Sequence, residues 1–126
     1  MGSHKMSEVS QTEKQIEQQM VGEQLSAVTF VMDYLQLQFN APTINAYTPV
    51  TVCLDENSWV TGDDQFRNKL CGQITKIVKS VTIRSEDTFL ITFEDGSLIS
   101  ISLRPSDYVG PEALGFRGRE NLWVVI

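Results

Sequence analysis

The chain has 126 residues, of which 41% are hydrophobic and 21% charged, a composition typical of one globular domain. Its net charge of −6 argues against a dedicated binder of nucleic acid or of anionic membranes, because both require a basic surface. The single histidine, His4, lies in a tag-like Met-Gly-Ser-His-Lys stretch. Without that stretch the sequence lacks the imidazole used by Ser–His and Cys–His nucleophiles and by histidine-containing zinc sites.

The N-terminal part is expected to be peripheral to the domain. Residues 1–20 are predicted to be a tag-like, mobile tail followed by a short helix over 11–21, which Gly22 ends. The apolar stripe of this helix consists only of Ile16 and Met20. A helix so short and so polar is marginal in isolation, so we expect it to form only if the stripe docks on the domain or on a partner.

The rest of the chain, 21–126, is predicted to form a single domain that begins with β-strands. Hydrophobic and polar residues alternate over 28–39, which is typical of half-buried antiparallel strands. A further strand is expected over 44–54, and Pro49 within it indicates an edge strand or a broken one. These strands make up unit one, about 21–60.

One helix is predicted between the two halves, over about 61–71, after a turn at 55–58. Asp63 and Asp64 suit the positive end of its dipole, and Gly72 ends it. We expect this helix to bridge the two halves of the domain.

Unit two, about 72–126, is again mostly strand. The Asp-Gly pair at 95–96 lies between two alternating apolar strands, which is the strongest short-range indication of a β-hairpin. The stretch 104–118 is predicted to be a loop, with a turn of helix beginning at Pro111. A last strand is expected over 122–126.

The two units share a pattern of residues. In each, a glycine (Gly22 or Gly72) precedes an aspartate that lies six residues before a phenylalanine (Phe39 or Phe93). Alternation alone would explain part of this match, and a duplication would explain all of it. The predicted fold class is α+β and mainly antiparallel, with two related β-meander units, one bridging helix and a short N-terminal helix.

The negative charge is concentrated in the first half of the chain. Between Lys14 and Arg67 the sequence has seven acidic residues and no basic one. An acidic patch around an exposed aromatic residue suits a basic protein partner. The alternatives are a solvated loop with a helix cap, and burial of the tryptophan in the core. The residues predicted to bind the partner are Asp55, Glu56, Trp59, Asp63 and Asp64.

Two further sites are predicted near the C-terminus. Tyr108 and Glu112 are candidates for lining a pocket, although Glu112 would equally cap the turn that begins at Pro111. The apolar last strand is a candidate edge for a homodimer or other homo-oligomer, because unpaired strand edges attract further strands. Its residues are Leu122, Trp123 and Val124.

No catalytic set, metal site or cofactor motif is predicted, so we expect no enzyme activity and no cofactor, with chemistry by carboxylates alone left open. Cys53 and Cys71 are expected to be reduced and mostly buried. The sequence has no apolar run of about 20 residues, the length that a membrane helix needs. We therefore predict a cytoplasmic protein without a membrane partner.

Part of unit two resembles small bacterial proteins of unknown function. Similar short proteins occur among immunity proteins of toxin systems and among products of mobile gene cassettes. The resemblance covers about 71–126 well and unit one loosely. It implies a non-enzymatic, immunity-like protein-binding module that presents an acidic face to a basic toxin or enzyme. The alternatives are a small-molecule-binding or regulatory module and a homo-oligomeric protein from a mobile element. The matching segments are Phe93-Glu94-Asp95-Gly96-Ser97-Leu98, Ser102-Leu103, Asp107-Tyr108 and Gly110-Pro111-Glu112-Ala113.

Overall fold

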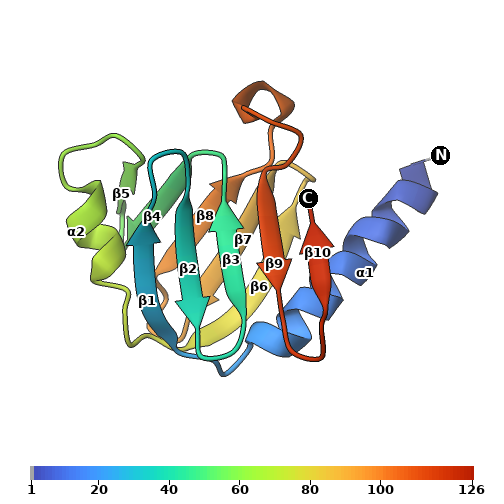
Figure 1. Cartoon of the computed structure of the whole chain (residues 1–126), viewed down its shortest axis with the longest axis horizontal. Coiled ribbons are helices and arrows are strands. Elements are labelled where there is room, and N and C mark those ends of the chain that lie inside the picture. Colours follow the sequence, from blue (N-terminus) through green and yellow to red (C-terminus); the bar gives the residue numbers. More distant parts are fainter. Residues whose placement is uncertain (1) are drawn as a thin grey trace.

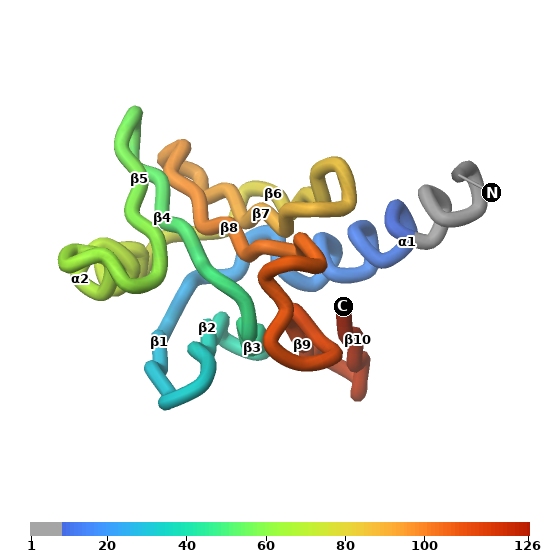
Figure 2. Tube along the Cα trace, turned by 90° about the horizontal axis from the view of Figure 1, so that it is seen from above, coloured from blue at the N-terminus to red at the C-terminus, as the bar shows by residue number. Residues whose placement is uncertain are grey.

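The computed structural model describes the backbone of residues 2–126 and the side chains of residues 9–126. Residue 1 and the side chains of the other tag-like residues, His4 among them, lie outside this description. Two five-stranded antiparallel sheets face each other as a sandwich, and one helix lies at each side of it (Figures 1 and 2). The predicted α+β, mainly antiparallel class is therefore confirmed.

The elements have the following bounds. Sheet I contains, in spatial order, β1 (Leu25–Phe30), β2 (Leu35–Phe39), β3 (Thr43–Ala46), β9 (Leu114–Arg117) and β10 (Trp123–Val125). Sheet II contains β5 (Asn57–Val60), β4 (Val50–Leu54), β8 (Leu98–Ser102), β7 (Thr88–Phe93) and β6 (Val78–Arg84). The helices are α1 (Gly2–Met20), α2 (Phe66–Cys71) and the short 3₁₀-helix η1 (Pro105–Asp107).

Each sheet combines three successive strands from one half of the chain with a two-stranded hairpin from the other half. Strand β4 pairs with β8 in sheet II, and β9 pairs with β3 in sheet I. The chain changes sheets after β3, where Pro49 separates β3 from β4, so the break predicted within 44–54 is confirmed. The two predicted units do not form separate meanders. Instead, the last hairpin of unit one (β4 and β5) pairs into the sheet of unit two, and the last hairpin of unit two (β9 and β10) pairs into the sheet of unit one.

Both helices begin at other positions than predicted. Helix α1 starts nine residues earlier than 11, since the preceding residues include no proline or internal glycine that would stop it. Helix α2 starts at Phe66 instead of 61, because the preceding residues form turns. There the Asp63 carboxylate accepts a hydrogen bond from the N–H of Val60 (2.8 Å). Asp63 therefore holds the end of β5 and does not cap the helix. Helix α2 lies beside β1 and β5 at one side of the sandwich (Figure 1).

The sequence analysis did not predict two short strands. Strand β5 occupies part of the turn predicted at 55–58, and β9 occupies part of the loop predicted at 104–118. Four residues offer too few alternating positions to be distinguished from loop. The helical turn predicted at Pro111 is absent from this described segment, and the 3₁₀-helix η1 lies upstream of it.

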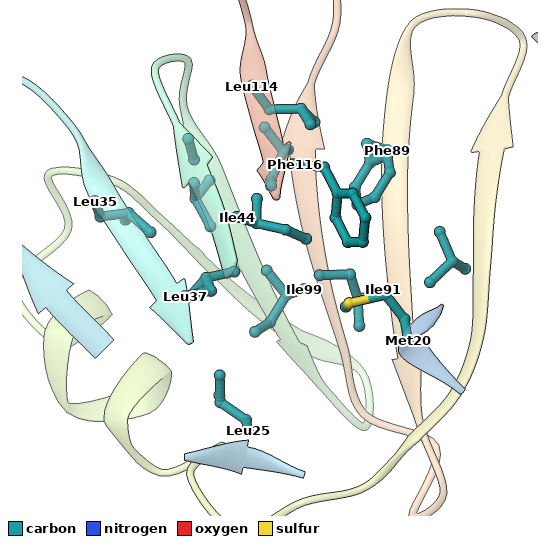
Figure 3. Packing of buried hydrophobic residues seen from close by; sticks show 14 of the residues in the cluster. Met20, Leu25, Leu35, Leu37, Ile44, Phe89, Ile91, Ile99, Leu114 and Phe116 are labelled. Carbon is teal, nitrogen blue, oxygen red and sulfur yellow. The ribbon is translucent and has the colours of Figure 1, made fainter. Parts of the chain in front are cut away.

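The hydrophobic core lies between the two sheets. Residues of sheet I point toward residues of sheet II, and Met20 from α1 completes the layer (Figure 3). Ile16 and Met20 are both fully buried, so the expected docking of the thin helical stripe is confirmed. The facing residues, all fully buried, are Leu37, Ile44 and Phe116 in sheet I and Phe89, Ile91 and Ile99 in sheet II.

Helix α1 covers the outer edge of β6. The Glu13 carboxylate accepts a hydrogen bond from the N–H of Ile83 (2.7 Å), and the Glu17 carboxylate accepts one from the N–H of Val81 (3.1 Å). Two outward-facing amides of an edge strand are thus satisfied by helix side chains, which prevents that edge from pairing with another strand. Within residues 2–126, no helix has the length and apolar character required to cross a bilayer.

Candidate functional site

A cleft of about 570 Å³ opens at one end of the sandwich. It is lined by the β1–β2 turn, the β3–β4 connection and the loop from β5 to α2, which Figure 1 shows at the same end of the molecule. This volume falls in the range of roughly 300–1,000 Å³ found for ligand pockets. We call it the Tyr34 cleft. Its aromatic and acidic lining residues include Phe30, Asp33, Tyr34, Tyr47, Asp63 and Asp64.

Two tyrosines form a ring pair in this cleft. Strands β2 and β3 pair so that Leu35 lies opposite Ala46, which brings Tyr34 and Tyr47 side by side at the strand ends. Their ring centroids are 5.4 Å apart and the ring planes are tilted by 48°. Neither hydroxyl has a hydrogen-bond partner among residues 9–126. The pair therefore offers both an aromatic surface and free polar groups to a ligand.

Carboxylates line the same cleft as the ring pair. Asp33 lies in the β1–β2 turn, and Asp63 and Asp64 lie in the loop before α2. Asp33 and Asp64 make no hydrogen bond or ion pair with any residue whose side chain is described. The basic residue in the described lining is Arg67, whose guanidinium carbon lies 5.1 Å from the Phe30 ring centroid. The cleft therefore has an excess of negative charge that attracts cations.

The structure divides the acidic set predicted from the sequence. Asp55 and Glu56 lie in the β4–β5 turn, whereas Asp63 and Asp64 follow the other end of β5, a strand of four residues or roughly 13 Å. Only the second pair lines the Tyr34 cleft. Trp59, between them, is half-buried and packs against the core, and the Lys69 ammonium lies 4.7 Å from its ring centroid.

A second cleft of about 570 Å³, the Tyr108 cleft, lies at the same end of the sandwich. Tyr108 lines it together with the β6–β7 turn and the last residues of the chain. Its partner in the sequence prediction, Glu112, is half-buried and is not among the residues lining this cleft. The structure thus brings only one of the two predicted pocket residues to a cleft.

The last strand is the outer strand of sheet I. In β10 the Trp123 side chain is 52% exposed, and the Arg117 guanidinium carbon lies 5.2 Å from its ring centroid. Leu122 and Val124 instead pack against the core. Within sheet I, β10 pairs only with β9. Oligomerisation through this strand stays a prediction.

A polar cluster lies at the start of the predicted hairpin turn. The Lys76 ammonium is 2.8 Å from the Asp95 carboxylate and 3.2 Å from the Ser97 hydroxyl. A serine beside a lysine is a nucleophile arrangement known from some hydrolases. Here the Lys76 ammonium is ion-paired with Asp95, and the buried Ser97 hydroxyl donates a hydrogen bond to the same carboxylate, so the cluster stabilises the β7–β8 turn.

The described side chains form no cluster suited to metal ligation or to thiol chemistry. Among the side chains of residues 9–126, no group of three or more His, Cys, Asp or Glu could hold a metal ion. Both cysteines are free, Cys53 half-buried and Cys71 exposed, so the expected burial is wrong for Cys71. Burial raises the pKa of the Cys53 thiol.

The sequence analysis missed the residues at the centre of the Tyr34 cleft. Tyr34 and Tyr47 each fit a half-buried strand, and nothing in the local pattern indicates that they meet. The one available indication was Met32, a large apolar residue in a turn, which is 93% exposed at the rim of the cleft. Its neighbour Val31 is also exposed, so the two residues form a small apolar patch at the rim.

Fold and site together define a two-sheet antiparallel α+β domain with an acidic, aromatic cleft at one end of the sandwich. A scan against protein-family models and searches of curated proteins and of solved structures find no match to this chain. A functional proposal therefore depends on the residues of the cleft.

Proposed function

We propose that this chain is a non-enzymatic, immunity-like protein-binding module that takes a basic side chain of its partner into the Tyr34 cleft. One observation carries the proposal: the Tyr34–Tyr47 ring pair lines the same cleft as the carboxylates of Asp33 and Asp64, which have no partner among the described residues. Ring faces and free carboxylates are the two groups that bind ammonium and guanidinium ions.

The chemistry favours a lysine or arginine side chain over a free metal ion. A cation on an aromatic face gains about 0.5–2 kcal/mol. The alkyl stem of a lysine or arginine side chain packs on apolar surface. The exposed residues Val31 and Met32 supply such a surface at the rim of the cleft. A small hydrated ion would gain nothing from these two residues.

Electrostatic steering adds to the association rate. The chain as a whole is acidic, with a net charge of −6, and the cleft shares that sign. An acidic surface accelerates encounter with a basic protein, and salt screens this effect over about 8 Å at physiological ionic strength. Binding should therefore weaken as salt concentration rises.

The proposal is tested with short oligo-lysine and oligo-arginine peptides of about four residues as probes, measured by calorimetry and by chemical-shift changes of the two tyrosine rings. We expect the double variant Asp33→Asn with Asp64→Asn to weaken binding about tenfold, because each lost carboxylate removes a charge-assisted contact. Replacing Tyr47 by Leu should also weaken it, without a change in net charge.

The matched control is the double variant Asp55→Asn with Glu56→Gln, which removes the same charge at the other end of β5. This variant should bind the peptides as the unmodified protein does. An equal loss of peptide affinity in both double variants would show that the peptides bind through non-specific electrostatic attraction, and would overturn the proposal. Binding of a neutral metabolite but not of the peptides would overturn it in favour of a small-molecule module.

We also propose that the two halves are an internal repeat. Both hairpins have a register shift at their first pair: Leu25 opposite Phe39 in β1–β2, and Val78 opposite Phe93 in β6–β7. The halves also approach each other as antiparallel equivalents, with a bridge between Gln24 and Ile77. Both features support a duplication, and alternation alone would not produce them. Identification of proteins that contain a single half would test it.

A further inference from the structure

One wall of the Tyr34 cleft carries a cation that belongs to the protein itself. The Arg67 guanidinium carbon lies 5.1 Å from the Phe30 ring centroid, and both residues line the cleft. A guanidinium within about 6 Å of a ring centroid is attracted to the face of that ring. Phe30 therefore already bears, from within the chain, the kind of group that the proposed function assigns to a partner.

Two different elements bring the ring and the guanidinium together. Phe30 is the last residue of β1 and pairs with the buried Leu35, so its ring lies on the inner face of sheet I and packs against the core. Arg67 lies in α2 directly after the buried Phe66, which anchors this short helix. Helix α2 lies beside β1 (Figure 1), so the Arg67 side chain extends from the helix to the sheet.

The Arg67 guanidinium is held only weakly in this position. Arg67 is exposed, and among the described side chains it makes no ion pair, although Asp63 and Asp64 line the same cleft. A cation–ring contact at an exposed site favours the contact only about twofold to fivefold. The Asp64 carboxylate, which has no partner among the described residues, stays available to an incoming cation. A side chain that contacts both a ring and a carboxylate can therefore displace Arg67.

The other two cation–ring contacts of the described structure lie outside the cleft. Lys69 contacts Trp59, with the ammonium 4.7 Å from the ring centroid, and Arg117 contacts Trp123 at 5.2 Å. None of these four residues lines the Tyr34 cleft. Among the described residues, the contact of Arg67 with Phe30 is thus the one that occupies the proposed binding surface.

We infer that Arg67 is an intramolecular competitor in the Tyr34 cleft, which occupies the Phe30 ring until an arginine of the partner displaces it. This inference rests on the proposed function and deepens it, because it names a guanidinium as the partner's cation and Arg67 as a residue that lowers its affinity. A ring that stacks with the planar guanidinium of Arg67 accepts the same group from a partner. Arg67 also places a like charge in the cleft, which repels the incoming cation.

The substitution Arg67→Gln tests the inference, with Lys69→Gln as the matched control. Each removes one positive charge from α2 and one cation from a ring, but only the first ring lines the cleft. The probe is an oligo-arginine peptide of about four residues, measured by calorimetry. We expect Arg67→Gln to bind it roughly threefold to tenfold more tightly than the unmodified protein, and Lys69→Gln to change the affinity less than about twofold.

The NMR signal of the Arg67 Nε–H group reports on displacement directly. In the unmodified protein, saturating peptide should move this signal to the position typical of a solvated arginine, because the guanidinium leaves the Phe30 ring. A second variant separates the ring from the charge. In a Phe30→Leu background, Arg67→Gln should tighten binding no more than Lys69→Gln does.

Three results would overturn the inference and leave the Tyr34 cleft proposal standing. The first is equal tightening in Arg67→Gln and Lys69→Gln, which would show a general effect of charge. The second is unchanged or weaker binding by Arg67→Gln, and the third is an Arg67 Nε–H signal that saturating peptide does not move. If neither the unmodified protein nor Arg67→Gln binds the peptide, the proposed function is overturned together with this inference.

Discussion

The carboxylate of Glu17 accepts a hydrogen bond from the backbone N–H of Val81, 3.1 Å away and 64 residues later in the chain. Helix side chains thereby occupy the position that a neighbouring strand would take along β6. The same helix buries Ile16 and Met20 completely, so α1 is an integral part of the sandwich despite its polar sequence.

Replacing these carboxylates should open the β6 edge. We expect Glu17→Ala and Glu13→Ala each to lower the free energy of unfolding by about 1 kcal/mol, because a hydrogen bond to a buried amide is lost. Glu17→Gln, which keeps an acceptor oxygen, should cost less. Urea denaturation measures these differences, and light scattering should detect more association of the double alanine variant. The exposed Gln18→Ala is the control, and a loss in that variant as large as in Glu17→Ala would contradict the assignment.

Stability at acidic pH should report on the turn between β7 and β8. Hydrogen bonds from Lys76 and Ser97 lower the pKa of the Asp95 carboxyl from 3.8 to about 2. A lowered pKa means that the ionised group stabilises the folded state above about pH 4, and that this contribution is lost as the pH falls toward 2.

The Asp95→Asn variant should therefore melt at a lower temperature than the unmodified protein at pH 7, and the difference should shrink between pH 4 and pH 2. Asp95 is 51% exposed, so high salt should reduce the difference as well. Thermal denaturation at several pH values measures the effect. A difference that stays constant down to pH 2 would show that Asp95 acts through its shape alone.

Thr75 and Gly22 have the same unusual backbone conformation, with φ of +89° and +87°. For a β-branched residue this conformation is strained by about 1–2 kcal/mol, and for glycine it is not. Thr75→Gly should therefore raise the free energy of unfolding by about 1 kcal/mol, since Thr75 is exposed and loses no packing.

Gly22→Ala should lower the free energy of unfolding by a similar amount. The new methyl group would meet no atom within 4 Å, so strain of the backbone is the only penalty. Guanidinium denaturation of the two variants measures this pair of opposite changes. Changes of the same sign in both variants would contradict the explanation by backbone strain.

The two thiols should differ in reactivity toward an aromatic disulfide reagent. Cys71 is exposed, whereas Cys53 is half-buried and burial raises its pKa. Because the thiolate is the reactive form, Cys53 should react more slowly in the folded protein. Denaturation should abolish the difference, and Cys71→Ser should remove the fast phase. Loss of the slow phase in that variant would contradict this order of reactivity.

The parts of the fold that could be predicted are those encoded locally. The hairpin of β7 and β8 follows from an Asp-Gly pair between alternating residues, and Gly96 has the positive φ of +91° that such a turn requires. The exchange of hairpins could not be predicted, because alternation gives the faces of a strand but not its neighbour. For the same reason Asp63 and Asp64 were candidates from charge alone, whereas Tyr34 and Tyr47 meet only through the pairing of β2 with β3.

The exchanged hairpins make the two halves inseparable. A cut in the loop between β5 and α2 would leave each fragment with a three-stranded sheet and a detached hairpin whose neighbours lie on the other fragment. Neither fragment could cover its hydrophobic core alone, so the two fragments should fold only when they are mixed. Their exchanged hairpins resemble the exchanged elements of a domain-swapped dimer, here within one chain. Such a chain is expected to unfold as one unit.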